Sequence, residues 1–240
     1  SGPLLDMDDC QLRGPHNAEN LMAALAVGHV VRVPLEQMVE ALKTYVPSPH
    51  RCERVAEING VQFINDSKAT NLAAVEKALL AIPAARSGEP NVLLIAGGKD
   101  KGLQYHDVGP LLAQRVKQAF LLGETREKIR AAWSLFTPCT VVESLLEAVS
   151  SAFENAVSGD VVLLSPACSS FDMFQNYQHR GEVFRQAVEQ LNRSRDPGAA
   201  GRVSNARSPD ENHFESGLEP ASNPNLAAEC FEGKLRREKL

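Results

Sequence analysis

The middle of the chain alternates between short apolar runs and longer segments in which apolar residues recur at helical spacing. The apolar runs, which we expect to be strands, lie at 92–96, 118–122, 140–142 and 160–164. The periodic segments, which we expect to be helices, lie near 70–82, 107–116, 124–133, 143–157 and 178–192. Strands that are apolar along their whole length are typical of a parallel sheet covered on both faces. The pattern therefore predicts a Rossmann-like α/β domain, with a mostly parallel sheet and helices on both faces.

A different pattern precedes this domain. Residues 17–30 carry small and apolar residues at helical spacing, and a second helix is expected after Pro34, which suits a first helical turn. Pro47-Ser48-Pro49 then interrupts the pattern. Residues 1–47 are therefore expected to be a separate unit from a domain over residues 48–192.

Toward its end the sequence becomes polar and rich in turn-forming residues. Pro197-Gly198, Ser208-Pro209 and Asn223-Pro224 punctuate a stretch with too few apolar residues to build a core. We expect residues 193–240 to be a mostly disordered tail, in which residues 225–240 could form a short charged helix.

The composition excludes several classes of protein. The chain has 240 residues, of which 43% are hydrophobic and 23% charged, and a net charge of −5 that gives no reason to expect nucleic acid or an anionic membrane as partner. No apolar run reaches the roughly 18 residues that span a bilayer, and the first residues do not resemble a secretory signal. The five cysteines are scattered, so neither a metal site nor a disulfide framework is expected. We therefore expect a protein of the reducing cytoplasm.

The most informative polar cluster follows a predicted hairpin. Asn59-Gly60 is a strong two-residue turn signal between the strand-like runs 54–57 and 61–64. The second run ends in Asn65-Asp66-Ser67-Lys68-Ala69-Thr70-Asn71. Open α/β sheets bind ligands at the carboxyl ends of their strands, where this heptad would lie. Taken alone, the same residues also fit an N-capped turn into the next helix.

Two further loops are expected at the same edge of the sheet. Residues 97–102 (Gly-Gly-Lys-Asp-Lys-Gly) combine glycines that permit tight turns with two lysines. They match neither the P-loop nor the dinucleotide-binding glycine pattern. Residues 123–126 (Gly-Glu-Thr-Arg) are expected to be a simple helix cap.

The fourth loop, residues 165–172, follows the last strand. It precedes a predicted helix, so its hydroxyl groups and the N–H groups of the helix N-terminus would suit a carboxylate or phosphate. Together with Lys101 and Ser170, these groups would suit a small dianion. Cys168 has no histidine partner in the sequence and is expected to be a packing residue.

Taken together, five ordered motifs resemble the Mur ligases. The motifs are Gly14 to Asn20, Pro49-His50-Arg51, Asn65 to Asn71, Gly97-Gly98 with Asp100-Lys101, and Ser165 to Gly181. The resemblance runs from about residue 5 to 192 and is strongest to the members that add D-glutamate to a peptidoglycan precursor. That family has a UDP-sugar domain, a central ATPase domain with a P-loop, and a Rossmann-like amino-acid domain. The resemblance implies a C-terminal fragment, with residues 1–47 ending the central domain and residues 48–192 forming the third.

The resemblance also implies roles for individual residues. The residues implied for ATP are Asn17, Asn20, Arg51 and Asp66. The residues implied for D-glutamate are Thr70, Lys101, Ser170 and Tyr177. Asn20 would contact adenine, Asp66 would lie near the ribose, and Lys68 would face the acyl phosphate as a catalytic residue. Tyr177 stands where the family usually has phenylalanine.

The resemblance implies an ATP-dependent ligase. ATP would activate the carboxylate of UDP-N-acetylmuramoyl-L-alanine as an acyl phosphate, which the amine of D-glutamate would attack. Mg²⁺ and the phosphates of ATP would be held mainly by residues outside this chain, so the fragment alone is expected to be inactive; we also expect a monomer. The alternatives are another amino-acid-adding Mur ligase, a relative of folylpolyglutamate synthase, or a non-catalytic binding module.

Overall fold

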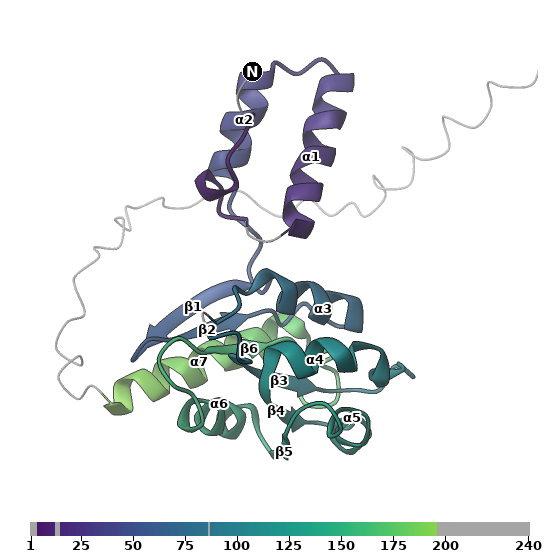
Figure 1. Cartoon of the computed structure of the whole chain (residues 1–240), viewed down its shortest axis with the longest axis vertical. Helices are drawn as coiled ribbons and strands as arrows, with labels where there is room; N and C mark the ends of the chain where they lie inside the picture. The colour runs from purple at the N-terminus through teal and green to yellow at the C-terminus, as the bar shows by residue number, and fades with distance from the viewer. Residues whose placement is uncertain (1–3, 13–14, 86, 196–240) are drawn as a thin grey trace, which may run out of the picture. The chain divides into compact units, whose positions relative to one another are not determined.

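The computed structural model describes residues 4–12, 15–85 and 87–195. Its first part contains a short 3-10 helix, η1 (Met7–Asp9), and two α-helices, α1 (Pro15–Val30) and α2 (Leu35–Thr44). The second part is an α/β domain (Figure 1). Its elements are β1 (Glu53–Ile58), β2 (Val61–Asn65), α3 (Leu72–Ala81), β3 (Val92–Gly97), η2 (Tyr105–Val108), α4 (Gly109–Arg115), β4 (Val116–Leu122), α5 (Arg126–Trp133), β5 (Cys139–Val141), α6 (Leu145–Glu154), β6 (Val161–Leu164) and α7 (Tyr177–Arg195).

The two helices of the first part pack against each other but bury few side chains. Leu21 is 4% exposed, whereas Met22 is 61% and Val30 is 78% exposed. Gly28 allows the helices to approach closely, because a Cβ at this position would lie 2.0 Å from the sulfur atom of Met38. Much of the apolar surface of this helix pair is therefore uncovered in the described part of the chain.

The α/β domain is built on a six-stranded sheet with the order β1-β2-β6-β3-β4-β5. Strands β2, β6, β3, β4 and β5 are parallel, and β1 pairs antiparallel with β2. The turn between β1 and β2 is Asn59-Gly60, and both residues have positive φ, as a tight hairpin turn requires. The predicted hairpin and the mostly parallel sheet are confirmed.

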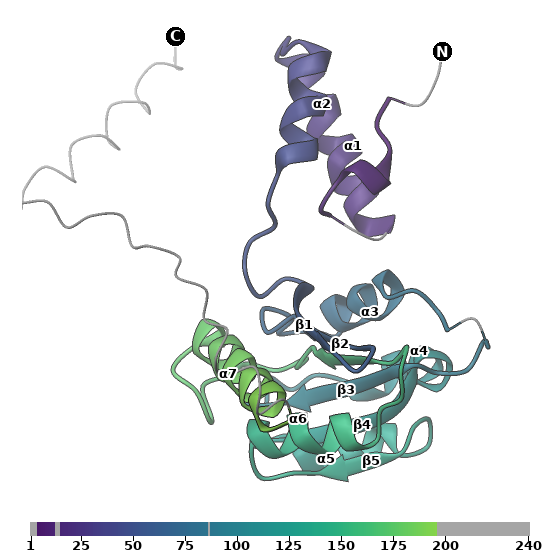
Figure 2. The ribbon, with the colours of Figure 1, turned by 90° about the vertical axis from the view of Figure 1, so that its left-hand side faces the viewer.

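Helices cover both faces of this sheet (Figure 2). The side chains of a strand alternate between the two faces. On β3, Val92, Leu94 and Ala96 belong to the core that contains α3, α4 and α5. Leu93 and Ile95 belong to the core that contains α6 and α7. The two-residue period of a strand therefore supplies two separate cores from one continuously apolar run.

The direction of the chain changes between three neighbouring strands of this sheet. Strands β2 and β3 lead into α3 and α4 on one face, whereas β6, which lies between them, leads into α7 on the other. Connections that leave adjacent strands toward opposite faces leave space between them, which is where open α/β sheets bind ligands.

The boundaries differ from the sequence expectation at a few places. The helix expected near 107–116 is divided into η2 and α4, and β4 begins at Val116. Helix α7 continues to Arg195, so the first residues of the expected tail are helical. Residues 196–240, which carry the rest of that prediction, lie outside the described residues. Across the described part of the chain, no helix is both long enough and apolar enough to span a bilayer.

Candidate functional site

The four polar loops expected from the sequence meet at the carboxyl edge of the sheet, and hydrogen bonds join them to one another. The loop after β6 is bonded to the loop after β3, where Lys99 N–H donates to Ser169 O at 2.9 Å. The same loop is bonded to the heptad, where Ser165 Oγ donates to Asp66 Oδ2 at 2.9 Å. The predicted convergence is therefore observed, with direct contacts between loops that are distant in sequence.

Asp66 is a buried carboxylate at the centre of this edge. Asp66 is only 6% exposed, and its Oδ1 atom accepts a hydrogen bond of 3.1 Å from Cys52 N–H. Burial raises the pKa of Asp66 to about 6, an effect that the bonds from Cys52 and Ser165 and the nearby charge of Arg51 offset only in part. This carboxyl group therefore changes charge close to neutral pH.

Arg51 is presented to Asp66 by an unusual turn. His50 and Cys52, on either side of it, have φ values of 65° and 42°, a region that non-glycine residues seldom occupy. The heptad holds the turn, since Lys68 N–H donates to His50 O at 3.1 Å and Cys52 N–H donates to Asp66. The turn therefore brings together Arg51, Asp66 and Lys68, three residues that the sequence analysis assigned to the nucleotide and phosphate side.

Residues expected to bind the amino acid also come together. Lys101 Nζ donates to the backbone oxygen of Thr70 at 3.3 Å, and Lys101 is exposed. Ser170 is 2% exposed and follows Ser169, which forms an isolated β-bridge with Lys99. An exposed ammonium group therefore lies beside the heptad, on a loop that runs next to the loop of Ser170.

Tyr177 connects the heptad to helix α7. Lys68 Nζ lies 5.7 Å from the centre of the Tyr177 ring, and Ser67 Oγ donates to Tyr177 O at 2.7 Å. The helix expected near 178–192 is confirmed: α7 begins at Tyr177, and Asn176 Oδ1 accepts a hydrogen bond from His179 N–H at 2.7 Å. Asn176 therefore caps the helix, and residues 173–176 separate the helix from the loop 165–172.

Arg180 on α7 is a buried guanidinium that holds two loops. It is 2% exposed, and it donates to Ser67 Oγ at 3.0 Å, to Ser67 O at 2.8 Å and to Cys168 O at 3.1 Å. Burial lowers the pKa of Arg180 to about 10, so the group still carries its charge at neutral pH. A fixed positive charge therefore lies directly behind the loops that carry the predicted ligand-binding residues.

Residues 123–126 do more than begin a helix. Thr125 occupies the N-cap position of α5, but its side chain makes no capping bond. Its hydroxyl group instead contacts Gly98 and Cys168. Cys168 is fully buried, and burial raises the pKa of its thiol, which agrees with the expected packing role.

The two predicted adenine-side residues lie on α1. Asn20 Nδ2 donates to Asn17 Oδ1 at 3.3 Å, as residues three apart on a helix can. The contact of Asn17 and Asn20 with a nucleotide stays a prediction.

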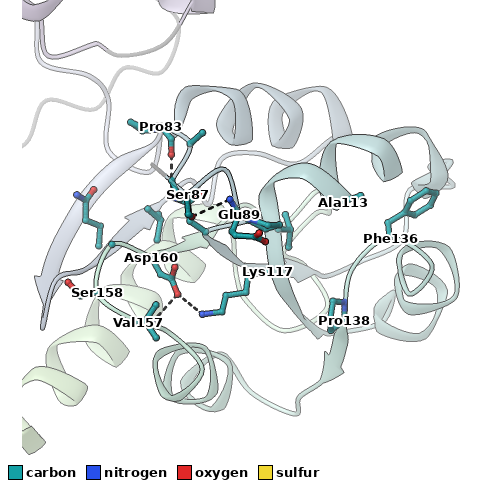
Figure 3. Close-up of a pocket in the computed structure, with 18 residues that line it drawn as sticks. Pro83, Ser87, Glu89, Ala113, Lys117, Phe136, Pro138, Val157, Ser158 and Asp160 are labelled. Atoms are coloured by element: carbon teal, nitrogen blue, oxygen red, sulfur yellow. Dashed lines mark hydrogen bonds and ion pairs between the residues drawn. The ribbon is translucent and has the colours of Figure 1, made fainter.

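The opposite, amino-terminal edge of the sheet carries a wide hollow of about 910 Å³ (Figure 3). Apolar side chains such as Pro83, Phe136 and Val157 line much of it. Lys117 Nζ and Asp160 Oδ2 form an ion pair of 2.8 Å in its wall. Although this hollow is large, none of the predicted site residues lines it.

No metal centre is evident in the part of the chain that the structure describes. Within those residues, no group of three or more histidine, cysteine, aspartate or glutamate side chains is placed to hold an ion. The carboxyl edge carries the cations Lys101, Lys68 and Arg51 around the carboxyl group of Asp66, and cations of this kind suit anionic ligands.

Sequence reasoning missed several residues that build the site. Arg180 and Thr125 are the most important, and both act through contacts with residues far away in the chain. Arg180 belongs to the fifth motif, and a charged residue at an otherwise apolar helix position is a signal for a buried partner. Thr125 carries no such signal, because a threonine before a helix is most simply explained as a cap.

Comparison with solved structures defines the class of the fold. A UDP-N-acetylmuramate-alanine ligase from Thermotoga maritima is similar with a TM-score of 0.58 at 17% identity, over 77% of this chain and 40% of that chain. A folylpolyglutamate synthase from Mycobacterium tuberculosis, complexed with ADP, has a TM-score of 0.55 at 17% identity, over 74% of this chain and 41% of that chain. At this level of identity, the similarity concerns the fold.

Sequence comparison identifies the family. The chain is 43% identical over 190 residues to the UDP-N-acetylmuramoylalanine–D-glutamate ligase of Caldicellulosiruptor bescii. The matched region covers 78% of this chain and 40% of the relative. The chain is also 43% identical over 188 residues to the enzyme of the same name from Pseudomonas aeruginosa, with 78% and 42% covered. The family model described as "Mur ligase, glutamate ligase domain" matches residues 50–168. The chain therefore belongs to the Mur ligase family, and it spans about 40% of the length of these relatives.

Proposed function

We propose that this chain is the amino-acid-binding part of an ATP-dependent ligase that adds D-glutamate to UDP-N-acetylmuramoyl-L-alanine in peptidoglycan precursor synthesis. The names of the relatives support the reaction. The observation that carries the proposal is the convergence of Lys101, Thr70 and the Ser170 loop at one edge of the sheet. A small amino acid with two carboxylates needs a cation at one end, and Lys101 supplies an exposed one.

The charges of the site fit an anionic ligand, although the chain as a whole is acidic. The net charge is −5, yet Lys101, Lys68 and Arg51 lie along the carboxyl edge and Arg180 lies behind it. Cations that are gathered against the average charge of a protein raise the local concentration of anionic substrates. On this proposal Thr70, Lys101, Ser170 and Tyr177 bind D-glutamate.

The chemistry needs little covalent participation from these residues. The amine nitrogen of D-glutamate forms a bond to the activated carbonyl carbon, phosphate leaves with the electrons of the broken C–O bond, and the amine loses a proton. The contribution of this chain is to bind and orient the amine, since positioning alone lowers the barrier to such a reaction considerably. Lys68, beside Tyr177, is the residue we propose to face the acyl phosphate.

ATP is the second proposed substrate. Arg51 and Asp66 form a cation and a hydrogen-bonding carboxylate at the same edge, and Asn17 and Asn20 are proposed for the adenine. The ADP-bound M. tuberculosis neighbour supports a nucleotide in this fold. As the resemblance to the Mur ligases implies, we propose that Mg²⁺ is held mainly by residues outside this chain.

The helix pair α1–α2 fits the end of a second domain. Its exposed apolar side chains include Met22, Val27 and Val30, all more than half exposed. The curated relatives extend well beyond the matched part, which supports a covering partner elsewhere in a longer chain. We propose that residues 1–47 end a central ATPase domain and that the protein works as a monomer in the cytoplasm.

A hybrid enzyme tests this proposal. The matched 42% of the P. aeruginosa relative is replaced by the corresponding part of this chain, and phosphate release from ATP is measured with UDP-N-acetylmuramoyl-L-alanine and different amino acids. We expect release with D-glutamate and much less with L-glutamate or D-alanine. The 240-residue chain alone should release no phosphate.

The controls separate the alternatives. The unmodified P. aeruginosa enzyme shows that the assay works, and a cooperative melting transition shows that the hybrid is folded. A folded hybrid that prefers another amino acid would support a different amino-acid-adding Mur ligase or a folylpolyglutamate synthase relative. A folded hybrid that turns over no amino acid would support a non-catalytic binding module.

A further inference from the structure

The loop that carries Lys101 begins with two glycines whose conformation is held from outside the loop. Gly97 and Gly98 have φ values of 117° and 142°, in the region that side chains disfavour. A Cβ at Gly98 would lie 2.2 Å from Ser169 O, so only glycine fits against the neighbouring loop. The turn is therefore both unusual in conformation and tightly packed.

Thr125 clamps this turn by bonding both polar groups of one residue. Gly98 N–H donates to Thr125 Oγ1 at 3.2 Å, and Thr125 Oγ1 donates to Gly98 O at 2.9 Å. Thr125 N–H also donates to Gly98 O, at 3.0 Å. Thr125 is 1% exposed, so no water can replace these bonds without a rearrangement.

The hydroxyl group of Thr125 also contacts a buried polar cluster. Cys168 Sγ lies 3.3 Å from Thr125 Oγ1 and 3.1 Å from the hydroxyl oxygen of Tyr105. Cys168 belongs to the loop after β6, and Tyr105 lies in η2. The hydroxyl group of Thr125 therefore stands where the loops after β3, β4 and β6 meet.

The fixed conformation of the Gly97-Gly98 turn also affects the position of Lys101, because the chain between them is short. Only two residues, Lys99 and Asp100, lie between Gly98 and Lys101, and Lys99 is fixed to Ser169 by its backbone N–H. The direction in which the loop leaves the turn at Gly98 thus sets where Lys101 and its contact with Thr70 lie.

We propose that Thr125 is a positioning residue for the amino-acid site: its hydroxyl group fixes the Gly97-Gly98 turn so that Lys101 is presented to a carboxylate of the substrate. This inference rests on the proposed function for the identity of the substrate. The fixing of the turn itself is independent of that function.

The test compares Thr125→Val, Thr125→Ser and Thr137→Val. Valine keeps the shape of threonine but removes the hydroxyl group, and serine restores it. Thr137 is a matched control, because it is 3% exposed and its hydroxyl group donates to Val116 O at 2.9 Å, at the amino-terminal edge. The first measurement is amide hydrogen exchange at Gly98 in the 240-residue chain. The second is the KM for D-glutamate and for ATP in the hybrid enzyme.

We expect Thr125→Val to speed exchange of the Gly98 amide, and to raise the KM for D-glutamate about tenfold while that for ATP changes little, as loss of about 1.4 kcal/mol would. Thr125→Ser should restore both quantities. Thr137→Val should lower stability similarly but leave Gly98 exchange and both KM values near those of the wild type.

Different results overturn different statements. Unchanged Gly98 exchange in Thr125→Val overturns the clamp, and equal effects of Thr125→Val and Thr137→Val on the two KM values reduce Thr125 to a stabilising residue. If the wild-type hybrid does not use D-glutamate, the proposed function fails. The exchange measurement then still decides whether Thr125 fixes the turn.

Discussion

The carboxyl-terminal and amino-terminal edges of the sheet are formed by the same strands, yet they bury polar groups to very different extents. Nine buried polar or charged residues of the described part lie at the carboxyl edge: His50, Asn65, Asp66, Ser67, Thr125, Ser165, Ser169, Ser170 and Arg180. Three lie at the amino edge: Asn91, Thr137 and Asp160. The large hollow is at the amino edge. The size of a cavity would therefore indicate a site at the amino edge, whereas the density of buried polar groups indicates one at the carboxyl edge.

The partners of these buried groups differ as well. At the amino edge, Asp160 Oδ2 accepts from Val157 N–H, a neighbour on the same turn, in addition to Lys117. At the carboxyl edge, Arg180 bonds to Ser67, 113 residues away. Buried polar groups are costly unless they are paired, so a network of distant pairs fixes several loops relative to one another. This difference favours the ordered loops over the hollow as the location of the proposed site.

The largest effect is expected from removing the centre of that network. Arg180→Met leaves the carbonyl oxygens of Ser67 and Cys168 without their donors, and the free energy of unfolding should fall by about 3 kcal/mol. Urea unfolding of the 240-residue chain measures this. Arg193→Met on the same helix is the control, because Arg193 is exposed and its loss should cost less than about 0.5 kcal/mol. Similar losses for both variants would mean that the network contributes no more than an ordinary surface arginine.

The second effect concerns pH. The pKa of Asp66 is about 6 in the folded chain against an ordinary 3.8, so its contribution to stability is fully present below pH 3.8 and is lost as pH rises through 6. The unfolding free energy of the wild type should fall by up to about 3 kcal/mol over this range, relative to Asp66→Asn, which cannot ionise. Urea unfolding at several pH values provides the comparison. Parallel pH profiles for the two proteins would show that the pKa of Asp66 is not raised in the folded chain.

The third effect tests the ligand side of the comparison. Lys101→Ala in the hybrid enzyme removes the exposed cation beside Thr70, and loss of a charge-assisted hydrogen bond costs about 1.5–3 kcal/mol. The KM for D-glutamate should rise about 10- to 150-fold, and that for ATP should change little. Lys99→Ala is the control on the same loop, because Lys99 is tied to Ser169 through its backbone. Equal shifts of both KM values by Lys101→Ala would place the residue in domain closure rather than in amino-acid binding.

The smallest effect is expected at the amino edge. Lys117→Met removes the ion pair with Asp160, which keeps its bond from Val157 N–H, and the unfolding free energy should fall by about 1 kcal/mol. The KM for D-glutamate in the hybrid enzyme should stay at the wild-type value. A large rise in the KM for D-glutamate would show that the amino edge affects substrate binding. It would contradict the assignment of binding to the carboxyl edge alone.

Most of the fold could be predicted from the sequence, because it depends on local patterns. The apolar run at 92–96 becomes β3, and Asn59-Gly60 becomes the hairpin turn. The helix expected near 178–192 is α7, which begins at Tyr177. The hydrogen bonds that hold the loop after β6, such as that from Ser165 Oγ to Asp66 Oδ2, could not be predicted. A local pattern carries no information on such contacts.

The candidate site was predictable in part for the same reason. The heptad and the Gly97-Gly98 loop are clusters of polar residues at strand ends, so Asp66 and Lys101 could be singled out. Thr125 and Arg180 act through hydrogen bonds to Gly98 and Ser67, and only the folded structure brings these pairs together.

The central claim is that the carboxyl edge binds a small dicarboxylic amino acid. Titration of the isotope-labelled 240-residue chain with D-glutamate, followed by NMR, tests it most directly, with L-glutamate as the matched control. We expect saturable shifts of the backbone amide signals of Thr70, Lys101 and Ser170, stronger with the D-isomer, while the signals of Asn91 and Lys117 at the amino edge stay unchanged. Shifts confined to the amino edge, or no saturable shift at the carboxyl edge, would contradict the account.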